Sequence, residues 1–429
     1  MKNEIIYRAG IRIRNPSLQK YFDFLIDSDR WDLERLEKLQ LEKTRELLIF
    51  ANRYSEYYKE LFKKVKFKPK DFQGLQDLKK IPISNKKDLL KYNKEIHSRY
   101  SFDKVFLSET SGTSGEVLKF YRNEEWDSFN RATMFRGYSW YNVKPWERNG
   151  YFWGYNFDRA KMIKTRVLDA LQNRFRLFTY DADEVRRFAE RLKGATYLTG
   201  YSSMIYEVAR IVNELGIRNE YDLKMVKGTS EKIFESYQDE VRAAFGRRII
   251  SEYGAAESGL IAFECPEGFM HINMENVIIE EENDEIVVTN LNSRSFPIIR
   301  YRLGDYIKLA DQGFRCPCGR AHPVILEVMG RVGGNIIGNK GIYPTLTLYY
   351  LFKNLSLVRG VSLSYQAVQK EKGKIILRIE QNSPEYTDLI KTEIRKYFKE
   401  DVDFDLQWGV SLRTKYGKIK DFITYIDQR

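Results

Sequence analysis

Three cysteines and one histidine form the clearest set of metal-ligand side chains in this sequence. The chain has 429 residues but only three Cys and three His. Cys265 and His271 make one short group, and Cys316 and Cys318 make a second. Three thiolates and one imidazole are a closed ligand set typical of structural zinc, whereas buried and inert cysteines are the ordinary alternative. We expect structural zinc, which would staple the base of a hairpin predicted between the two groups.

A run of small residues suggests a second kind of chemistry. It follows a strand-like stretch at 104–108 and consists of Thr110, Ser111, Gly112, Thr113, Ser114 and Gly115. Such a loop exposes backbone N–H groups and hydroxyls, and its glycines have no Cβ to block a close approach, so it can cradle a polyphosphate. Taken alone, the same composition is typical of a surface loop. The rest of the chain decides between the two interpretations.

Three further motifs carry a charged side chain in a turn. Glu257 follows a strand-like run at 248–251, in the place where α/β proteins bind ligands, and a carboxylate there could hold Mg²⁺. Asp305 ends the motif that begins at Arg300, and it could accept hydrogen bonds from a ribose diol. Lys418 follows a glycine and could present its ammonium to a phosphate or a carboxylate. Each of the three is also compatible with an ordinary exposed turn.

The elements that must position these residues alternate between helix and strand. Apolar residues recur with helical period between about 31 and 64. From about 125 to 290, helical stretches alternate with short apolar strands, which predicts α/β layering. Residues 276–290 have the pattern of a β-hairpin. The clearest single elements in the alternating region are the helices at 183–193 and 203–215 and the strand at 197–199.

A glycine-rich segment at 331–335 divides the chain into two predicted domains. The large domain covers 1–331 and contains layered sheets and helices. The small domain covers 332–429 and has a different, α+β order of elements. Its expected elements are strands at 361–368 and 375–379, a helix at 384–398 and a strand at 404–412. We expect the small domain to be mobile about the glycine-rich segment.

Composition narrows the class of protein. The chain is 43% hydrophobic and 31% charged, with a net charge of +12, which is compatible with an ordinary globular enzyme. No apolar run is long enough for a membrane span, and the N-terminus lacks the apolar core of a signal peptide. We therefore expect a cytoplasmic protein. No nucleic-acid-binding module is present, so nucleic acid is not an expected partner.

The order of the motifs resembles that of the adenylate-forming enzymes. Within this superfamily the chain is similar to the phenylacetate–CoA ligase branch, including the coenzyme F390 synthetase and CapK-like proteins. The resemblance covers most of the chain, and the Cys/His set also matches that branch, where such residues bind zinc. Supporting stretches are Leu78–Ile83, Gly200–Ser203, Thr229–Glu231 and Pro297–Arg302.

The resemblance implies an ATP-dependent, AMP-forming acid–thiol ligase. ATP and a carboxylic acid would give an acyl-adenylate and pyrophosphate, and the acyl group would then pass to coenzyme A or another thiol. The expected cofactors are ATP, Mg²⁺ and structural Zn²⁺, with coenzyme A as co-substrate. Transfer to an amine or hydroxyl acceptor, in polysaccharide, peptide or cofactor biosynthesis, is the alternative. The identity of the acid and the oligomeric state are left open, and a homodimer is compatible with the sequence.

The resemblance also implies roles for individual residues. The loop from Thr110 to Gly115 would wrap the β- and γ-phosphates, and Glu257 would hold Mg²⁺. Lys418 would bridge the substrate carboxylate and the α-phosphate. Asp305 would bind the ribose hydroxyls. The remaining nucleotide-binding residues would be Ser230, Glu231, Tyr253, Gly254 and Arg331, and the acyl pocket would include Tyr151, Trp153, Tyr155, Tyr201 and Ser202.

Three departures from the family pattern bear on activity. Glu116 stands where Lys or Thr is common after the phosphate loop, and an acid beside a triphosphate is unfavourable unless it points away. Ala256 replaces a common Thr, which removes one hydroxyl donor. Gly333 and Gly334 stand where the superfamily commonly has an Asp near the hinge. Glu116 and Ala256 support a competing hypothesis, a non-catalytic nucleotide-binding relative, which the retained Glu257, Asp305 and Lys418 disfavour.

Overall fold

The computed structural model describes residues 2–110, 118–152, 159–177, 182–217, 221–231, 233–331, 335–361, 363–412 and 421–426. The chain forms two compact units. The first unit comprises Met1–Trp146, Glu252–Leu303 and Ile307–Val328. The second comprises Glu147–Ser251, Gly304–Tyr306 and Met329–Arg429. Among the described residues, no helix combines the length and the apolar character that crossing a membrane requires.

Helices open the first unit, and the two that follow Asp32 and Ser55 begin with a capping side chain. The side chain of Asp32 accepts a hydrogen bond from the backbone N–H of Arg35, and Ser55 caps the next helix in the same way through Tyr58. Such caps satisfy N–H groups that have no partner within the helix. The predicted helical region at 31–64 is thereby confirmed as two helices. The helices of this unit are α1 (Lys2–Arg14), α2 (Leu18–Ser28), α3 (Leu33–Tyr54), α4 (Glu56–Lys64), α5 (Lys86–Lys91), α6 (Asn93–Ile96) and α7 (Glu124–Ser139).

Antiparallel strands make up most of the first unit's sheets. β1 (Val105–Glu109) and β2 (Lys119–Asn123) form a separate two-stranded ribbon. The larger sheet has the strand order β10-β11-β12-β13-β9-β8-β7. Its strands are β7 (Ile249–Ala255), β8 (Gly259–Glu264), β9 (Met270–Ile272), β10 (Val277–Glu282), β11 (Glu285–Asn290), β12 (Tyr301–Leu309) and β13 (Val324–Arg331).

The predicted hairpin at 276–290 is confirmed as β10 and β11. Asn283 and Asp284 connect the strands, and both have positive φ, 57° and 64°. Two-residue hairpin turns favour this conformation because it matches the twist of the strands, and Asn and Asp tolerate it better than most residues. The turn therefore sets the register that pairs Glu282 with Glu285.

One apolar core joins the helices to the sheet of the first unit. Tyr58 of α4 is 1% exposed, so its polar hydroxyl needs hydrogen-bond partners inside the core. Its hydroxyl donates to the carbonyl of Pro297 at 3.1 Å and accepts from the N–H of Ile299 at 3.2 Å. Burial raises the pKa of Tyr58 well above its ordinary value. The phenol thereby satisfies two backbone groups just before β12, where the chain leads to Tyr301.

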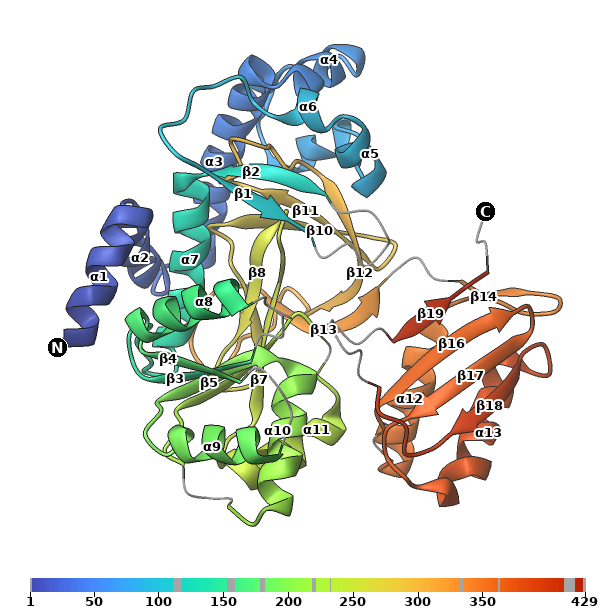
Figure 1. The fold of residues 1–429 in the computed structure, drawn as a ribbon. Helices are drawn as coiled ribbons and strands as arrows, with labels where there is room; N and C mark the ends of the chain where they lie inside the picture. The colour runs from blue at the N-terminus through green and yellow to red at the C-terminus, as the bar shows by residue number, and fades with distance from the viewer. Residues whose placement is uncertain are drawn as a thin grey trace. The chain divides into compact units, whose positions relative to one another are not determined.

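Parallel strands build the second unit, as the alternating sequence pattern predicts. The order is β7-β6-β5-β3-β4, with parallel pairing from β6 through β5 and β3 to β4. The helix α8 follows β3, and three later helices cover the opposite face of the sheet (Figure 1). The elements are β3 (Asn149–Phe152), α8 (Arg159–Leu171), β4 (Arg174–Leu177), α9 (Ala182–Leu192), β5 (Tyr197–Tyr201), α10 (Ser202–Glu214), β6 (Met225–Thr229) and α11 (Glu235–Phe245).

The C-terminal part of the second unit is an α+β module with its own four-stranded sheet, in the order β18-β17-β16-β19. The strand at 375–379 and the helix near 384–398 are confirmed. The strand predicted at 361–368 begins only at Tyr365, and the last predicted strand ends at Gln407 instead of 412. The sequence pattern missed α12, whose apolar side chains are not confined to one helix face. The elements are β14 (Asn335–Ile337), β15 (Ile342–Pro344), α12 (Leu346–Arg359), β16 (Tyr365–Glu371), β17 (Lys374–Ile379), η3 (Pro384–Tyr386), α13 (Thr387–Phe398), β18 (Asp403–Gln407) and β19 (Phe422–Thr424). The domain boundary near 331 stays a prediction.

Within the second unit, the C-terminal module packs against α11. Phe234 and Tyr237 belong to the same apolar cluster as the module's sheet and helices. The hydroxyls of Ser236 and Ser364 lie 2.9 Å apart. Glu380 lies at this contact, where burial raises its pKa to about 7, while Arg210 and a hydrogen bond with Ser364 oppose the rise.

Replacing Glu380 by Gln is expected to remove a pH dependence of stability. Because the pKa rises from 4.5 in the unfolded chain to about 7 in the folded one, the folded state binds the extra proton between these values. The associated stabilisation is complete below pH 4.5 and is lost as the pH rises through about 7. In urea unfolding at a series of pH values, Glu380→Gln should therefore gain stability relative to the wild type as the pH rises through this window. The exposed Glu385→Gln is the matched control, and a difference that is flat with pH would contradict the prediction.

Candidate active site and metal centre

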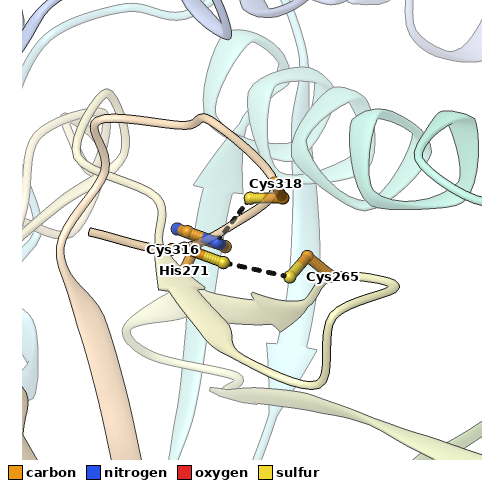
Figure 2. A group of neighbouring side chains, drawn as sticks. All are labelled: Cys265, His271, Cys316 and Cys318. Atoms are coloured by element: carbon orange, nitrogen blue, oxygen red, sulfur yellow. Dashed lines mark hydrogen bonds between the residues drawn. The ribbon is translucent and has the colours of Figure 1, made fainter. Parts of the chain in front are cut away.

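Three strands of the first unit bring the four predicted metal ligands together (Figure 2). Cys265 directly follows β8, and His271 lies in β9. Cys316 and Cys318 lie in the connection between β12 and β13. His271 is paired with Phe263 of β8 on one side and with Val324 of β13 on the other. The sheet therefore juxtaposes two chain segments that are far apart in sequence.

The spacing of the four ligand atoms suits a single tetrahedral ion. All four lie within 4.8 Å of one another. The Sγ atoms of Cys265 and Cys316 are 3.7 Å apart, and the Sγ of Cys318 is 3.1 Å from Nε2 of His271. Zinc–sulfur bonds of about 2.3 Å at tetrahedral angles place two sulfurs about 3.8 Å apart. The ligand set contains no carboxylate, so it favours a thiophilic ion over Mg²⁺ or Ca²⁺.

A backbone carbonyl orients the histidine of this cluster. Nδ1 of His271 lies 2.9 Å from the carbonyl oxygen of His322, so Nδ1 carries the proton and Nε2 is left with a lone pair. Burial lowers the pKa of His271 to about 4, which keeps the ring neutral. A neutral imidazole with one nitrogen hydrogen-bonded to a carbonyl is the usual form of a metal-ligating histidine.

The three thiols differ in how easily they lose a proton. Burial raises the pKa of Cys265 and raises that of Cys316 to about 12. Burial also acts against ionisation of Cys318, but hydrogen bonds from Arg320 and Cys316 outweigh it and lower the pKa of Cys318. A cation that binds here would displace the remaining thiol protons. Arg320 is a residue of this centre that the spacing of Cys and His did not indicate.

The cluster corrects one expectation about the hairpin. The sequence suggested that the ligands staple the base of β10 and β11. In the sheet, β12 and β13 separate that hairpin from β9. The ligands instead join the turn after β8 to the β12–β13 connection. The error arose because nearness in sequence was taken for nearness in the sheet, although a long connection can bring in strands from elsewhere.

The predicted phosphate loop lies between two paired strands. β1 and β2 are antiparallel, with Glu109 opposite Lys119, and the loop connects them. The N–H of Thr110 donates to the carbonyl of Leu118 at 2.9 Å, and the N–H of Leu118 donates to Oγ1 of Thr110 at 3.1 Å. The base of the loop is thereby closed. Ser111, Gly112, Thr113, Ser114, Gly115 and Glu116 lie outside the described residues.

Glu257 lies in the turn between β7 and β8, where Ala255 pairs with Gly259. It is 7% exposed. The hydroxyl of Tyr301 donates to its Oε1 at 3.0 Å. A buried carboxylate needs such partners to offset the loss of hydration. Tyr253 lies upstream in the same strand and is half-buried, and Gly254 packs so closely on Gly259 that a Cβ would lie 2.5 Å from the carbonyl oxygen of Gly259.

Three asparagines hold this turn in place. Oδ1 of Asn130 accepts from the N–H of Leu260 at 2.6 Å. Nδ2 of Asn290 donates to the carbonyl of Ser258 at 2.6 Å, and Nδ2 of Asn276 donates to the carbonyl of Leu260 at 2.9 Å. Gly259 has a φ of +75°, and any Cβ there would approach all three amides. The asparagines and Tyr301 were missed from the sequence, because nothing in their spacing links them to Glu257.

In the second unit, two predicted residues lie together at the carboxyl ends of neighbouring strands. Ser202 follows β5 and is fully buried, and its hydroxyl donates to the carbonyl of Glu231 at 3.3 Å. Ser230 follows β6 with a φ of +68°, a strained conformation for a residue with a side chain. Tyr201 ends β5 and is 7% exposed. Carboxyl ends of parallel strands are where α/β proteins bind ligands.

The remaining predicted residues belong to neither of the groups above, or they lie outside the described residues. Tyr151 of β3 lies beneath two guanidinium groups, with their carbons 4.1 Å (Arg174) and 4.5 Å (Arg176) from its ring centroid. Burial raises the pKa of Tyr151, although these arginines oppose the rise. Asp305 is half-buried in β12, and Arg331 ends β13. Trp153, Tyr155 and Lys418 lie outside the described residues.

Comparison with known proteins finds distant relatives. No family model matches the chain. Protein CapK of Staphylococcus aureus is 21% identical over 300 residues, which cover 65% of this chain and 64% of CapK. Phenylacetate-coenzyme A ligase of Thermus thermophilus is 22% identical over 390 residues, covering 83% of this chain and 84% of that protein. The match to CapK therefore spans slightly less than two thirds of CapK's length.

A solved structure shares the fold over nearly the whole chain. The 2-hydroxyisobutyryl-CoA ligase, in its postadenylation state in complex with R3-HIB-AMP, has a TM-score of 0.71 to this chain at 15% identity. The alignment covers 94% of this chain and 91% of the ligase. This agreement confirms the predicted α/β adenylate-forming fold. In fold the chain is similar to a solved CoA ligase, and in sequence it is distantly similar to CapK and phenylacetate-coenzyme A ligase.

Proposed function

We propose that the protein activates a carboxylic acid with ATP and passes the acyl group to coenzyme A or another thiol. The observation that supports this most directly is Glu257, a buried carboxylate on a turn held by three asparagines, in a chain with the adenylate-forming fold. Such rigid support suits a residue that must hold a charge in a fixed position. The name of the Thermus relative and the acyl-adenylate bound to the 2-hydroxyisobutyryl-CoA ligase are in agreement with this activity.

The chemistry needs no nucleophilic side chain. An oxygen of the substrate carboxylate attacks the α-phosphorus of ATP, the bond from that phosphorus to the β-phosphate oxygen breaks, and pyrophosphate leaves. In the second step, the sulfur of a thiol attacks the acyl carbon and AMP leaves, while the thiol proton passes to solvent. The protein's part is to position the reactants and to stabilise negative charge at the α-phosphate.

Different residues of the chain would bind Mg²⁺, the nucleotide and the acid. Glu257 would hold Mg²⁺, which supplies positive charge to the phosphates when it is bound. The loop from Thr110 to Gly115 would bind the β- and γ-phosphates, and Asp305 the ribose. Lys418 would bridge the carboxylate and the α-phosphate. Adenine would lie beside Ser230, Glu231 and Tyr253, with Gly254 and Arg331 nearby, and the acyl group near Tyr151, Trp153, Tyr155, Tyr201 and Ser202.

Pyrophosphate release tests the proposal. Purified protein, ATP and Mg²⁺ are incubated with a panel of aromatic, aliphatic and hydroxy acids, with and without coenzyme A. We expect release that depends on one class of acid, and a thioester product when coenzyme A is present. Acid-dependent release without a thioester would identify an amine or hydroxyl acceptor instead. If no acid in a broad panel stimulates release, the catalytic proposal is wrong.

Substitutions at Glu257 and Tyr301 should distinguish the effect of the Glu257 charge from the effect of the hydrogen bond that positions it. Glu257→Gln keeps the shape and a hydrogen bond to Tyr301 but loses the charge, so we expect acid-dependent pyrophosphate release to fall by roughly 10²-fold. Tyr301→Phe removes one hydrogen bond and should cost only about 5-fold, because one such bond is worth about 1 kcal/mol.

The dependence of the rate on Mg²⁺ distinguishes a metal-binding role of Glu257 from a structural one. The Gln variant should need a higher Mg²⁺ concentration for half-maximal rate, whereas Glu281→Gln, an exposed acid on β10, should behave as the wild type. An unchanged Mg²⁺ requirement in Glu257→Gln would exclude Glu257 as the metal-binding carboxylate.

We also propose that Cys265, His271, Cys316 and Cys318 bind one structural zinc ion. The sulfur spacing and the neutral, carbonyl-bound His271 support this assignment. Four protein ligands fill a tetrahedral shell and leave no position for a reactive water, which is why the role is structural.

The small C-terminal domain, 332–429, would act as a mobile lid that carries Lys418. A lid of this kind allows one site to run two half-reactions, because moving it withdraws Lys418 and admits the thiol acceptor. Gly333 and Gly334 would form its pivot. The contact of Ser364 and Glu380 with the helices of the second unit would hold the lid in one of its positions.

A further inference from the structure

The helix α8 (Arg159–Leu171) lies along one face of the parallel sheet of the second unit (Figure 1). Four large apolar side chains on it are strongly exposed, namely Ile163 (65%), Val167 (56%), Leu168 (47%) and Leu171 (48%). A surface helix of a globular protein normally turns its apolar stripe toward the core. A contiguous exposed apolar patch of this kind marks an interaction surface.

The spacing of these residues places them on one side of the helix. Ile163, Val167 and Leu171 are four residues apart, so they lie one above the other, and Leu168 flanks them. The opposite side carries Asp169, which is 4% exposed. Its two oxygens accept hydrogen bonds from Nε and Nη2 of Arg176 at 2.8 and 2.9 Å. The acid therefore anchors α8 to β4, and the apolar side faces outward.

The charges of the helix are mostly positive. Segment 159–171 contains four basic residues and one acid, and the acid is the buried Asp169. Lys164 and Arg166 are exposed. The outward face therefore combines an apolar centre with positive charge, on a chain whose net charge is +12. Two copies of such a face would repel each other, whereas an anionic surface would attract it.

We propose that α8 docks the protein on the surface of a bilayer that contains anionic lipid. The helix would lie in the plane of the membrane, with Ile163, Val167 and Leu171 at the boundary of headgroups and acyl chains. Amphipathic helices with basic flanks bind in this way, and Lys164 would extend its ammonium to the lipid phosphates while its stem stays among the apolar side chains. The association is peripheral. It does not depend on the proposed acid activation.

Flotation with lipid vesicles tests this surface without ATP or any acid. The probes are vesicles of phosphatidylcholine alone and of phosphatidylcholine mixed with an equal part of phosphatidylglycerol. We expect the wild type to bind the mixed vesicles and to be released by raised salt, because salt screens the attraction. Val167→Ser with Leu171→Ser should weaken binding at least about 100-fold, since each buried aliphatic side chain contributes about 1.5–3 kcal/mol.

Two single variants complete the design. Lys164→Gln should weaken binding to the mixed vesicles about 5-fold, which corresponds to ~1 kcal/mol per basic residue near an anionic surface. Ile49→Ser removes an exposed isoleucine (41%) from α3, a helix of the first unit, and should bind as the wild type. Circular dichroism and acid-dependent pyrophosphate release then report on folding and activity separately from docking.

Three outcomes would overturn the inference. The first is a wild type that does not bind the mixed vesicles. The second is equal binding to neutral and mixed vesicles, since charge would then play no part. The third is a change of oligomeric state in the Val167→Ser, Leu171→Ser variant, seen by light scattering without any effect on vesicle binding. That last result would assign the face to a contact between two copies of the chain.

Discussion

Replacing Cys318 by Ser is expected to abolish zinc binding and to lower the melting temperature by roughly 10 °C or more. Structural zinc contributes several kcal/mol to folding, and each kcal/mol shifts the melting temperature of a domain of this size by about 2–4 °C. Cys318 is suited to this test because it is the least buried of the three thiols. The serine is nearly isosteric, so the substitution changes the ligand more than the packing. Metal analysis and thermal unfolding, with and without a chelator, measure the two effects.

The stability effect should be concentrated in the first unit. The ligands join the turn after β8 to the β12–β13 connection, and His322 of that connection is hydrogen-bonded to the buried Glu275 at 3.0 Å. Glu275 also accepts from Nη1 of Arg136 at 2.6 Å. Burial disfavours the charged form of Glu275, but Arg136 and His322 outweigh this effect and hold its pKa well below its usual range. Loss of zinc would loosen the connection that helps to keep this buried charge paired.

A matched variant shows whether the effect is specific to the ligands. His97→Gln also removes one histidine, but His97 contacts the backbone of Asn93 and Tyr121 and belongs to no thiol cluster. It should keep the zinc content of the wild type. A wild type that carries no zinc, and that melts at the same temperature with and without chelator, would exclude a structural metal in this centre.

Replacing Lys418 by Ala is expected to lower acid-dependent pyrophosphate release by about 10²–10³-fold, the usual effect of removing one fixed positive group from the transition state. The ammonium would balance charge that builds up on the α-phosphate as the carboxylate attacks. Binding of ATP should change little, because the triphosphate loop and Glu257 remain. The measurement is the initial rate of pyrophosphate formation at saturating ATP and acid.

The second half-reaction provides an internal comparison. When the preformed acyl-adenylate and coenzyme A are supplied, Lys418→Ala should form the thioester at nearly the wild-type rate, since the lid would have withdrawn Lys418 at that step. Lys415→Ala, in the same segment, controls for a general loss of positive charge. If Lys418→Ala retains full adenylation activity, Lys418 has no role in this step.

Local features of the structure were predictable because their causes are local. The hairpin of β10 and β11 follows from alternating apolar residues and from Asn283 and Asp284 at its turn, where a positive φ is needed. The helices α3 and α4 follow from apolar periodicity and from the capping side chains of Asp32 and Ser55. The helix α12 was missed because its apolar residues surround it, which removes the periodic signal.

Side chains that meet across the fold could not be predicted in the same way. Tyr301 and Glu257 are 44 residues apart in sequence, and Asn130 reaches the same turn from 130 residues away. Their contacts depend on the strand order β12-β13-β9-β8-β7 and on how α7 packs against β8. Strand order is decided by long-range pairing, and for that reason the expected stapling of the hairpin was wrong.

By itself, the sequence determined which chemistry the chain can offer. Three thiols and an imidazole define a thiophilic metal set, and the motif order through Glu257, Asp305 and Lys418 defines an acid-activating enzyme as the hypothesis to test. The tertiary structure alone decided which ligand atoms lie within reach of one ion, which partners hold Glu257, and which side of α8 faces outward. These outcomes depend on packing between distant segments, where burial and hydrogen bonding are satisfied jointly and not residue by residue.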